Sequence, residues 1–323
     1  MSLAIKSMLN RQQHWAQMEE LGIYWLMRFA FRLYRVGGRL IFRPLLYPVV
    51  SYYFVSNRLA RQASLDFLQH VETYSGGMVT KRNLFNSYRH FLSFADSMVD
   101  KLGAWTNRIK IEDVVVHNRD IIKQLLDRRE GCVILVSHLG NVEISRALAT
   151  IGTSAKLNIL VHTKHARQFN RLLKDVSGSH FTELIQVTDI SPMLAISLDK
   201  KIAAGEFVFI VGDRVPVGNS GRTLTASFLG DEAQFAQGPY ILAALMKCKV
   251  YTLFCLKQQG VYHLYFDHFS DRILLPRKNR EAAIAGYVQV FSGRLQKFCL
   301  MAPLQWFNFY LYWQQPVEHN PLS

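Results

Sequence analysis

The sequence predicts an α/β fold, with a largely parallel central sheet flanked by helices and an N-terminal amphipathic helical arm. Half of the 323 residues are hydrophobic, which is enough to build a sizeable core. From Gly131 onward, short apolar runs alternate with segments of helical periodicity, and this alternation is typical of a parallel sheet covered by helices. Before that point, residues 21–55 are apolar but are interrupted by arginine every three or four residues. This pattern indicates an amphipathic helix.

The arm is assigned to residues 1–60 and is expected to associate with a membrane. Its apolar side suits a helix that lies among lipid headgroups, and its basic side suits anionic lipid. The alternative is a helix packed on the protein with a solvated basic face. A spanning helix is not expected, because it needs about 20 mostly uncharged residues, and no secretory signal is expected at the start. The arginines are Arg28, Arg32, Arg35, Arg39 and Arg43.

The α/β domain is assigned to residues 61–323, with residues 61–130 as a helical lead-in. Helical periodicity covers residues 57–69 and 81–102 of this region, and a turn is expected between them at Ser75, Gly76 and Gly77. Ligands bind such sheets beyond the carboxyl ends of the strands. The expected strands are 132–137, 157–161, 184–187, 207–211 and 250–256, and the expected helices between them are 142–151, 166–176, 192–204 and 239–247.

Charge and cysteine content limit the classes of partner. The formal net charge of +14 favours anionic lipid, nucleic acid or an acidic protein. Nucleic acid is not expected, because the sequence holds no P-loop, no dinucleotide glycine fingerprint and no recognisable nucleic-acid module. The four scattered cysteines form no CxxC pair and indicate a reducing compartment. No metal and no cofactor are expected, since His162 and His165 have no accompanying cluster of ligands.

The segment after the first expected strand is the strongest indication of chemistry. His138 stands at the carboxyl end of that strand, Gly140 permits a tight turn, and Glu143 falls in the first turn of the following helix. A carboxylate then comes within reach of an imidazole. The histidine can remove a proton from an acceptor hydroxyl, while the carboxylate fixes its tautomer and stabilises the imidazolium. His138 and Glu143 are therefore predicted to be catalytic, with a structural histidine as the alternative.

Several segments resemble the lysophospholipid acyltransferase superfamily, in the branch of the bacterial late lipid A biosynthesis acyltransferases. Residues 136–143, VSHLGNVE, resemble its first signature block, and RPLLYPVVSYYF in the arm is similar to the N-terminus of these proteins. Three further blocks follow in the family's order: FVFIVGDR at 207–214, FLGDEAQFAQGPYILAALMKCKV at 228–250, and PLQWFNFYLYW at 303–313.

The resemblance implies a membrane-associated acyltransferase. The donor would be an acyl thioester, either acyl-carrier protein or acyl-CoA, and the acceptor a hydroxyl of a lipid or glycolipid. Acyl-carrier protein is acidic and fits the basic surface. The location implied is the cytoplasmic face of the bacterial inner membrane, with peripheral or monotopic attachment to an anionic surface. The family carries a functional arginine after the second strand, and Arg167 is the candidate here, although neither it nor Arg171 aligns cleanly.

Other residues are candidates by their place in the expected fold. Asp213 and Arg214 follow the strand at 207–211, where they could contact the acceptor or support His138, or form a surface salt bridge. Arg222 could bind an acceptor phosphate or be solvated. Gly238 begins a helix whose apolar face could line an acyl groove or belong to the ordinary core. Asn141 could orient a group of the site or cap the helix after it.

Two other functions compete with acyl transfer. A thioesterase or lipase would use His138 with a serine nucleophile, typically in G-x-S-x-G, and the sequence contains no such motif. Ser137 adjoins His138 on the strand, so its side chain should point to the opposite face. A non-enzymatic membrane or nucleic-acid binder is compatible with the charge but leaves His138, Glu143 and Asp213 unexplained.

Overall fold

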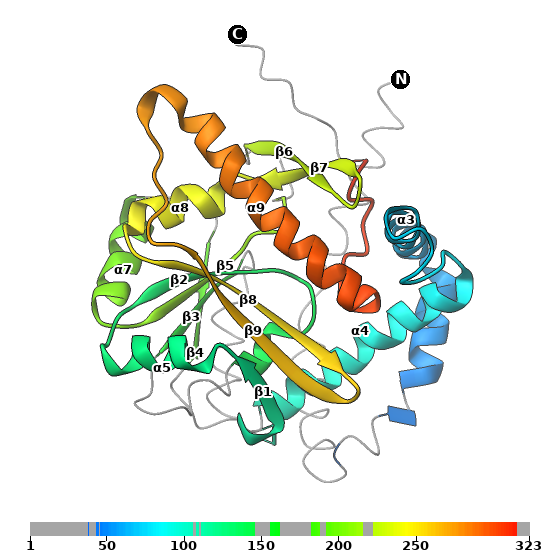
Figure 1. Cartoon of the computed structure of the whole chain (residues 1–323). Coiled ribbons are helices and arrows are strands. Elements are labelled where there is room, and N and C mark those ends of the chain that lie inside the picture. Colours follow the sequence, from blue (N-terminus) through cyan, green and yellow to red (C-terminus); the bar gives the residue numbers. More distant parts are fainter. Residues whose placement is uncertain are drawn as a thin grey trace. The chain divides into compact units, whose positions relative to one another are not determined.

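A computed structural model describes residues 38, 43–44, 46–105, 108–109, 111–145, 156–161, 182–187, 192–215 and 222–314 (Figure 1). Residues 45–323 form one compact unit, which contains the whole sheet and the helices around it. Most of the expected amphipathic arm, including four of its five arginines, lies outside the described residues. Residues 46–56 are described and are helical. None of the helices in the described part of the chain is long and apolar enough to cross a membrane.

A seven-stranded sheet in the order β1-β9-β8-β2-β5-β3-β4 forms the centre of the unit. Strands β8, β2, β5, β3 and β4 are parallel to one another, whereas β9 and β1 run in the opposite direction. The largely parallel sheet is therefore confirmed. The strands are β1 (Val114–His117), β2 (Cys132–Val136), β3 (Leu157–Val161), β4 (Thr182–Gln186), β5 (Phe207–Val211), β8 (Val250–Gln258) and β9 (Val261–Ser270).

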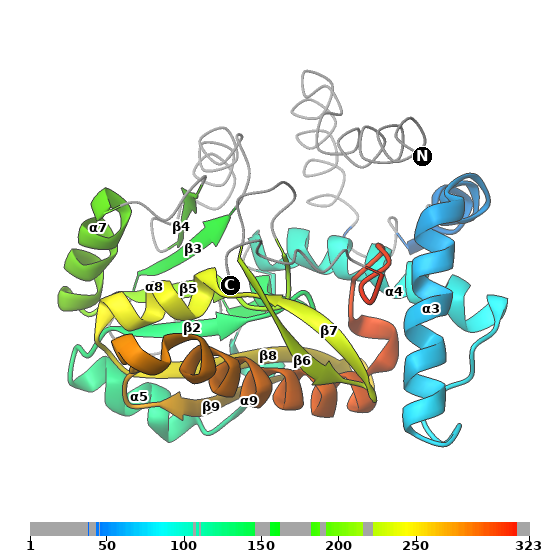
Figure 2. The ribbon, with the colours of Figure 1, turned by 90° about the horizontal axis from the view of Figure 1, so that it is seen from above.

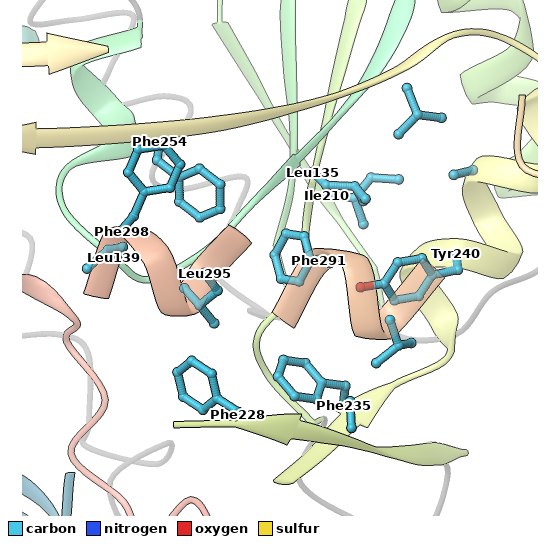
Figure 3. Close-up of a cluster of buried hydrophobic side chains, with 14 of the residues drawn as sticks. Leu135, Leu139, Ile210, Phe228, Phe235, Tyr240, Phe254, Phe291, Leu295 and Phe298 are labelled. Carbon is cyan, nitrogen blue, oxygen red and sulfur yellow. The ribbon is translucent and has the colours of Figure 1, made fainter. Parts of the chain in front are cut away.

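Helices cover both faces of this sheet, because its central strands are apolar on both sides. Every residue of β2 is buried, and alternate residues enter two different cores. Val133 and Leu135 pack with α8 and α9, whereas Ile134 packs with α5; Figure 3 shows the first of these cores around α9. The helices are α3 (Arg58–Tyr74), α4 (Leu84–Trp105), α5 (Arg119–Asp127), α7 (Pro192–Ala203), α8 (Gly238–Met246) and α9 (Arg280–Met301), with short 3-10 helices η1 (Ile111–Asp113), η3 (Arg277–Asn279) and η4 (Pro303–Gln305).

Two features at one side of the sheet bring distant parts of the chain together. The β6–β7 hairpin (Thr223–Phe228 and Asp231–Ala236) lies over α9 (Figure 1), where Ser292 Oγ donates to the Ser227 carbonyl at 2.7 Å. Helix α3 stands beside α4 and beside residues 303–313, which follow α9 and which we call the closing segment (Figure 2). The closing segment thereby reaches the turn that follows β2.

The expected elements agree with the structure where they are apolar runs buried in the sheet. Strands 157–161 and 207–211 have the expected bounds, and β2, β4, β8, α7 and α8 differ by one or two residues at their ends. The expected helix at 166–176 lies outside the described residues, and only residues 142–145 of the helix at 142–151 are described, as a 3-10 turn. The lead-in is not purely helical, because the apolar run at 114–117 pairs with β9 as strand β1.

Candidate active site

The chain leaves β2 through a turn that has room only for glycine at position 140. Gly140 has a φ of +73°, and a Cβ there would collide with the Cys255 carbonyl oxygen of β8. The turn is fixed to its neighbours on both sides: the Gly140 N–H donates to the Gln305 carbonyl at 2.8 Å, and the Asn141 N–H donates to the Cys255 carbonyl at 2.9 Å. This turn presents His138 at the carboxyl end of β2.

The register of the sheet places Asp213 opposite His138. Val136 of β2 pairs with Val211 of β5, and His138 and Asp213 each lie two residues beyond that pair. Nδ1 of His138 lies 2.9 Å from Oδ1 of Asp213, and the His138 backbone N–H donates to Oδ2 at 2.8 Å. Support of His138 was one of the two roles considered for Asp213, and the structure shows this contact.

Three N–H groups surround the buried carboxylate of Asp213, whose side chain is 1% exposed. The third donor is Nε1 of Trp306 in the closing segment, at 2.9 Å from Oδ2. Burial raises the pKa of Asp213, but the charge on His138 and the three hydrogen bonds outweigh this effect and hold the pKa below its usual value. Asp213 is therefore an anion at neutral pH, and it only accepts hydrogen bonds.

The tautomer of His138 follows from this contact. An ionised carboxylate at Nδ1 requires the proton of the neutral imidazole to be on Nδ1, so Nε2 carries a lone pair. The His138 side chain is 31% exposed, whereas its carboxylate partner is almost completely buried. A basic nitrogen at a partly open position, oriented by a buried anion, can accept a proton from a bound hydroxyl.

The structure places Asp213 at Nδ1 of His138, and the catalytic role of Glu143 stays a prediction. We expected Glu143 to fix the tautomer of His138, but Asp213 occupies Nδ1. Glu143 is partly buried on the 3-10 turn at 142–145, and its charge acts on Lys101 of α4. Burial lowers the pKa of the Lys101 amine, Glu143 partly offsets this, and the positive charge of Arg214 lowers it further. The carboxylate on the turn after His138 thus lies within electrostatic range of the Lys101 amine.

The other predicted site residues have different surroundings. Asn141 is buried and donates to the Ser97 carbonyl of α4 at 3.1 Å, so it ties the turn to that helix. Arg214 donates to the Phe307 carbonyl at 3.5 Å.

Two further candidates make no hydrogen bond to the His138–Asp213 pair within the described residues. Arg222 is exposed next to β6, and Gly238 begins α8. Arg167 lies outside the described residues.

Sequence reasoning missed two residues that hold the site together. Trp306 was noted only as part of a family-like block, and His90 was not noted at all. His90 is buried in α4, and its Nε2 lies 2.8 Å from the Trp306 carbonyl oxygen. A buried tryptophan or histidine needs a hydrogen-bond partner, but nothing in the sequence shows which partner the fold supplies.

No group of three or more histidine, cysteine, aspartate or glutamate side chains that could hold a metal ion occurs among the residues that the structure describes. All four cysteines are free, and three of them are buried.

Comparison with known proteins assigns the family. The family model described as bacterial lipid A biosynthesis acyltransferase matches residues 86–315, which include His138, Glu143, Asp213 and Trp306. A comparison with curated proteins returned no match. The matched region extends over well more than half of the chain and contains the complete sheet. The chain therefore belongs to the bacterial lipid A biosynthesis acyltransferase family, and it is an acyltransferase.

Proposed function

We propose that this enzyme moves a fatty acyl group from an acyl thioester, acyl-carrier protein or acyl-CoA, to a hydroxyl of a lipid or glycolipid at a membrane surface. The family itself supports acyl transfer to a lipid acceptor. One observation carries the mechanism: Asp213 occupies Nδ1 of His138 at 2.9 Å and leaves Nε2 free of the imidazole proton. His138 is accordingly the general base.

The reaction uses this one nitrogen twice. Nε2 takes the proton from the acceptor hydroxyl while the hydroxyl oxygen attacks the carbonyl carbon of the thioester. Asp213 stabilises the imidazolium that forms. When the tetrahedral intermediate collapses, the carbon–sulfur bond breaks and the leaving thiolate takes the proton from Nε2. The products are an ester and a free thiol. This sequence of steps needs no cofactor and no metal.

The neighbouring charges suit the binding of an anionic acceptor. The positive charges of Lys101 and Arg214 lie within electrostatic range of each other, and Nε of Arg214 has no hydrogen-bond partner within the described residues. We assign Arg214 to acceptor binding, together with Arg222 and Arg167 as further candidates. Glu143 remains a proposed catalytic residue, since its carboxylate follows His138 closely in the chain and can accept a hydrogen bond from the acceptor.

Exposed side chains on the helical segment 46–56 support attachment to a membrane surface. Tyr52 is 76% exposed and Val55 is 74% exposed, and Tyr47, Val49 and Tyr53 are also exposed. Tyrosine is typical of membrane–water interfaces, where its ring lies among headgroups. Such a surface fits peripheral attachment at the cytoplasmic face of the bacterial inner membrane, with the preceding basic residues against anionic lipid.

Among the described residues, the serine next to His138 is not placed to act as the nucleophile that the hydrolase alternative needs. Ser137 is 4% exposed, and its Oγ accepts the Leu139 N–H at 3.2 Å, so the hydroxyl is held inside the turn. The sequence contains no G-x-S-x-G motif. Transfer to an acceptor hydroxyl is therefore favoured over hydrolysis through a serine ester.

Product analysis tests the proposal. Purified protein is incubated with a labelled acyl thioester and membrane lipid, and the products are separated as acylated lipid and free fatty acid. Acylated lipid should dominate, and His138→Ala should abolish it while leaving the protein folded. If the unaltered protein released mainly free fatty acid, the proposed transferase activity would be wrong and the protein would be a hydrolase.

A further inference from the structure

We infer that Trp306 is a positioning residue of this site: its indole N–H, held in place by a buried line of hydrogen bonds from α4, fixes the carboxylate of Asp213 and limits how strongly that carboxylate draws a proton onto His138. The inference rests on the proposed role of His138 as general base. It gives the closing segment, whose Trp306 is 93 residues from Asp213 in sequence, a role in controlling the proton on His138.

The two oxygens of the Asp213 carboxylate have different partners. Oδ1 faces the imidazole at 2.9 Å, whereas Oδ2 accepts two N–H groups, from the His138 backbone at 2.8 Å and from Trp306 at 2.9 Å. Hydrogen bonds to one oxygen of a carboxylate draw its negative charge toward that oxygen. The indole therefore weakens the charge that Oδ1 presents to the imidazole, and it also prevents rotation of the carboxylate.

The ring of Trp306 is completely buried. Four aromatic rings surround it, with centroid distances of 4.9 Å to Phe67, 5.2 Å to Phe228, 5.0 Å to Tyr312 and 6.1 Å to Trp313. This packing leaves the indole one orientation. A buried N–H without a partner is costly, so the ring and the carboxylate fix each other.

A line of buried hydrogen bonds holds the backbone of the closing segment. The Trp306 carbonyl accepts from Nε2 of His90 at 2.8 Å, Nδ1 of His90 lies 3.0 Å from Ser64 Oγ, and Ser87 Oγ donates to Ser64 at 2.9 Å. Burial lowers the pKa of His90 to about 4, so its ring is neutral. Each group then donates to the next, from Ser87 through Ser64 and His90 to Trp306.

The segment is also joined directly to the catalytic turn. The Phe307 N–H donates to the His138 carbonyl at 3.0 Å, and the Gly140 N–H donates to the Gln305 carbonyl at 2.8 Å. The residues on both sides of Trp306 thus bind the turn that carries the base. A movement of the closing segment relative to the turn would break these contacts.

The test removes the indole N–H and measures the protonation of His138 directly. Trp306→Phe keeps an aromatic ring and loses the donor. The matched control is Trp313→Phe, which loses the same group from the same aromatic cluster, where the indole donates to the Phe228 carbonyl at 3.3 Å. The probe is diethyl pyrocarbonate, which modifies neutral imidazole, and the rate at the His138 peptide is followed by mass spectrometry against pH. His268, with 46% of its side chain exposed, serves as internal reference.

In Trp306→Phe the midpoint for His138 should rise by about half a pH unit or more, because the two donors from His138 keep Asp213 ionised while its charge concentrates on Oδ1. The midpoint should not move in Trp313→Phe. In the acyl-transfer assay, Trp306→Phe should lower kcat roughly 10- to 100-fold, with KM within about twofold and the acid limb at higher pH.

An unchanged or lowered midpoint, or the same shift in both variants, would overturn the inference. If Trp306→Phe does not fold, benzothienylalanine at position 306 makes the same test, since it keeps the two-ring shape and replaces N–H by sulfur. The midpoint is measured without substrate. A protein that transfers no acyl group would therefore refute the proposed function, while the shift still decides the role of Trp306.

Discussion

Two turns leave the sheet side by side, after β2 and after β5, and both carry a carboxylate. The turn after β2 is fixed through its backbone, which bonds to Cys255 and Gln305. The turn after β5 is fixed through a side chain, because three N–H groups converge on Asp213. The carboxylate that touches the imidazole is thus 75 residues from it in sequence, whereas Glu143, five residues away, acts on Lys101.

This difference shows what each kind of proximity can do. A short connection brings Glu143 near His138, but the direction of its side chain depends on the turn between them. The pairing of two parallel strands aligns residues at equal offsets beyond the paired positions, and it leads directly to the contact between His138 and Asp213. Substitutions in the two turns test whether the carboxylate that contacts the imidazole, Asp213, contributes more to catalysis than Glu143.

The largest effect is expected from Asp213→Asn. Two N–H donors face the Oδ2 position, so the amide carbonyl must lie there and its NH₂ must face Nδ1 of His138. The imidazole would then carry its proton on Nε2 and could not act as a base. We expect kcat to fall roughly 10³- to 10⁴-fold, measured in the acyl-transfer assay on folded protein.

Glu143→Gln is the matched comparison for that variant. It also replaces a carboxylate by an amide, but it leaves the bond between Asp213 and His138 intact. We expect a loss of roughly 10- to 100-fold. A greater loss for Glu143→Gln than for Asp213→Asn would reverse the assignment of the two carboxylates.

The next largest effect is expected from Gly140→Ala in the turn after β2. The variant combines a left-handed backbone with a collision against the Cys255 carbonyl oxygen, and the free energy of unfolding should fall by about 2–5 kcal/mol. Gly77→Ala is the control, because Gly77 has a φ of +76° with no atom within 4 Å of an added Cβ. Urea unfolding of both variants separates the collision from the backbone strain, and equal losses would show that the close approach to β8 is unimportant.

A smaller effect is expected from His90→Gln in the line that supports the closing segment. The pKa of buried His90 is lowered from 6.5 to about 4, so the unfolded chain binds the proton first as the pH falls. Stability from the neutral ring is complete above the unfolded value of 6.5 and is lost by about 3 kcal/mol at pH 4. Glutamine can make both hydrogen bonds without titrating.

Urea unfolding at pH 7.5 and pH 4 checks this prediction. Between the two pH values, the free energy of unfolding should fall by about 3 kcal/mol less in His90→Gln than in the unaltered protein. Equal losses in the two proteins would show that His90 is not the group responsible.

The fold was predictable where burial alone decides the structure. Residues 157–161 and 207–211 are apolar runs covered on both faces, and their strands have the expected bounds. Strand β9 and the β6–β7 hairpin were not identified, because partly exposed strands carry polar residues among the apolar ones. Strand β1 was missed for another reason: it has only four residues, and they are held as a strand by pairing with the edge of β9.

The sequence allowed prediction of those site residues that lie close together along the chain, but not of the contacts that the fold makes between distant residues. His138 and the glycine turn could be recognised from local spacing, and the end of a strand is where Asp213 was sought. The choice between the two carboxylates could not be made, since it depends on β2 and β5 being neighbours. The contact of Trp306 with Asp213 spans 93 residues, and no pattern within the closing segment indicates it.

The most direct measurement of the central claim, that His138 and Asp213 act as one catalytic unit, is a double-mutant cycle in the acyl-transfer assay. His138→Ala alone should lower kcat roughly 10²- to 10⁴-fold. Because Asp213 acts only through the imidazole, His138→Ala combined with Asp213→Asn should be no worse than His138→Ala within about threefold. Losses that multiply in the double variant, with all proteins folded, would contradict the account and give Asp213 a role separate from His138.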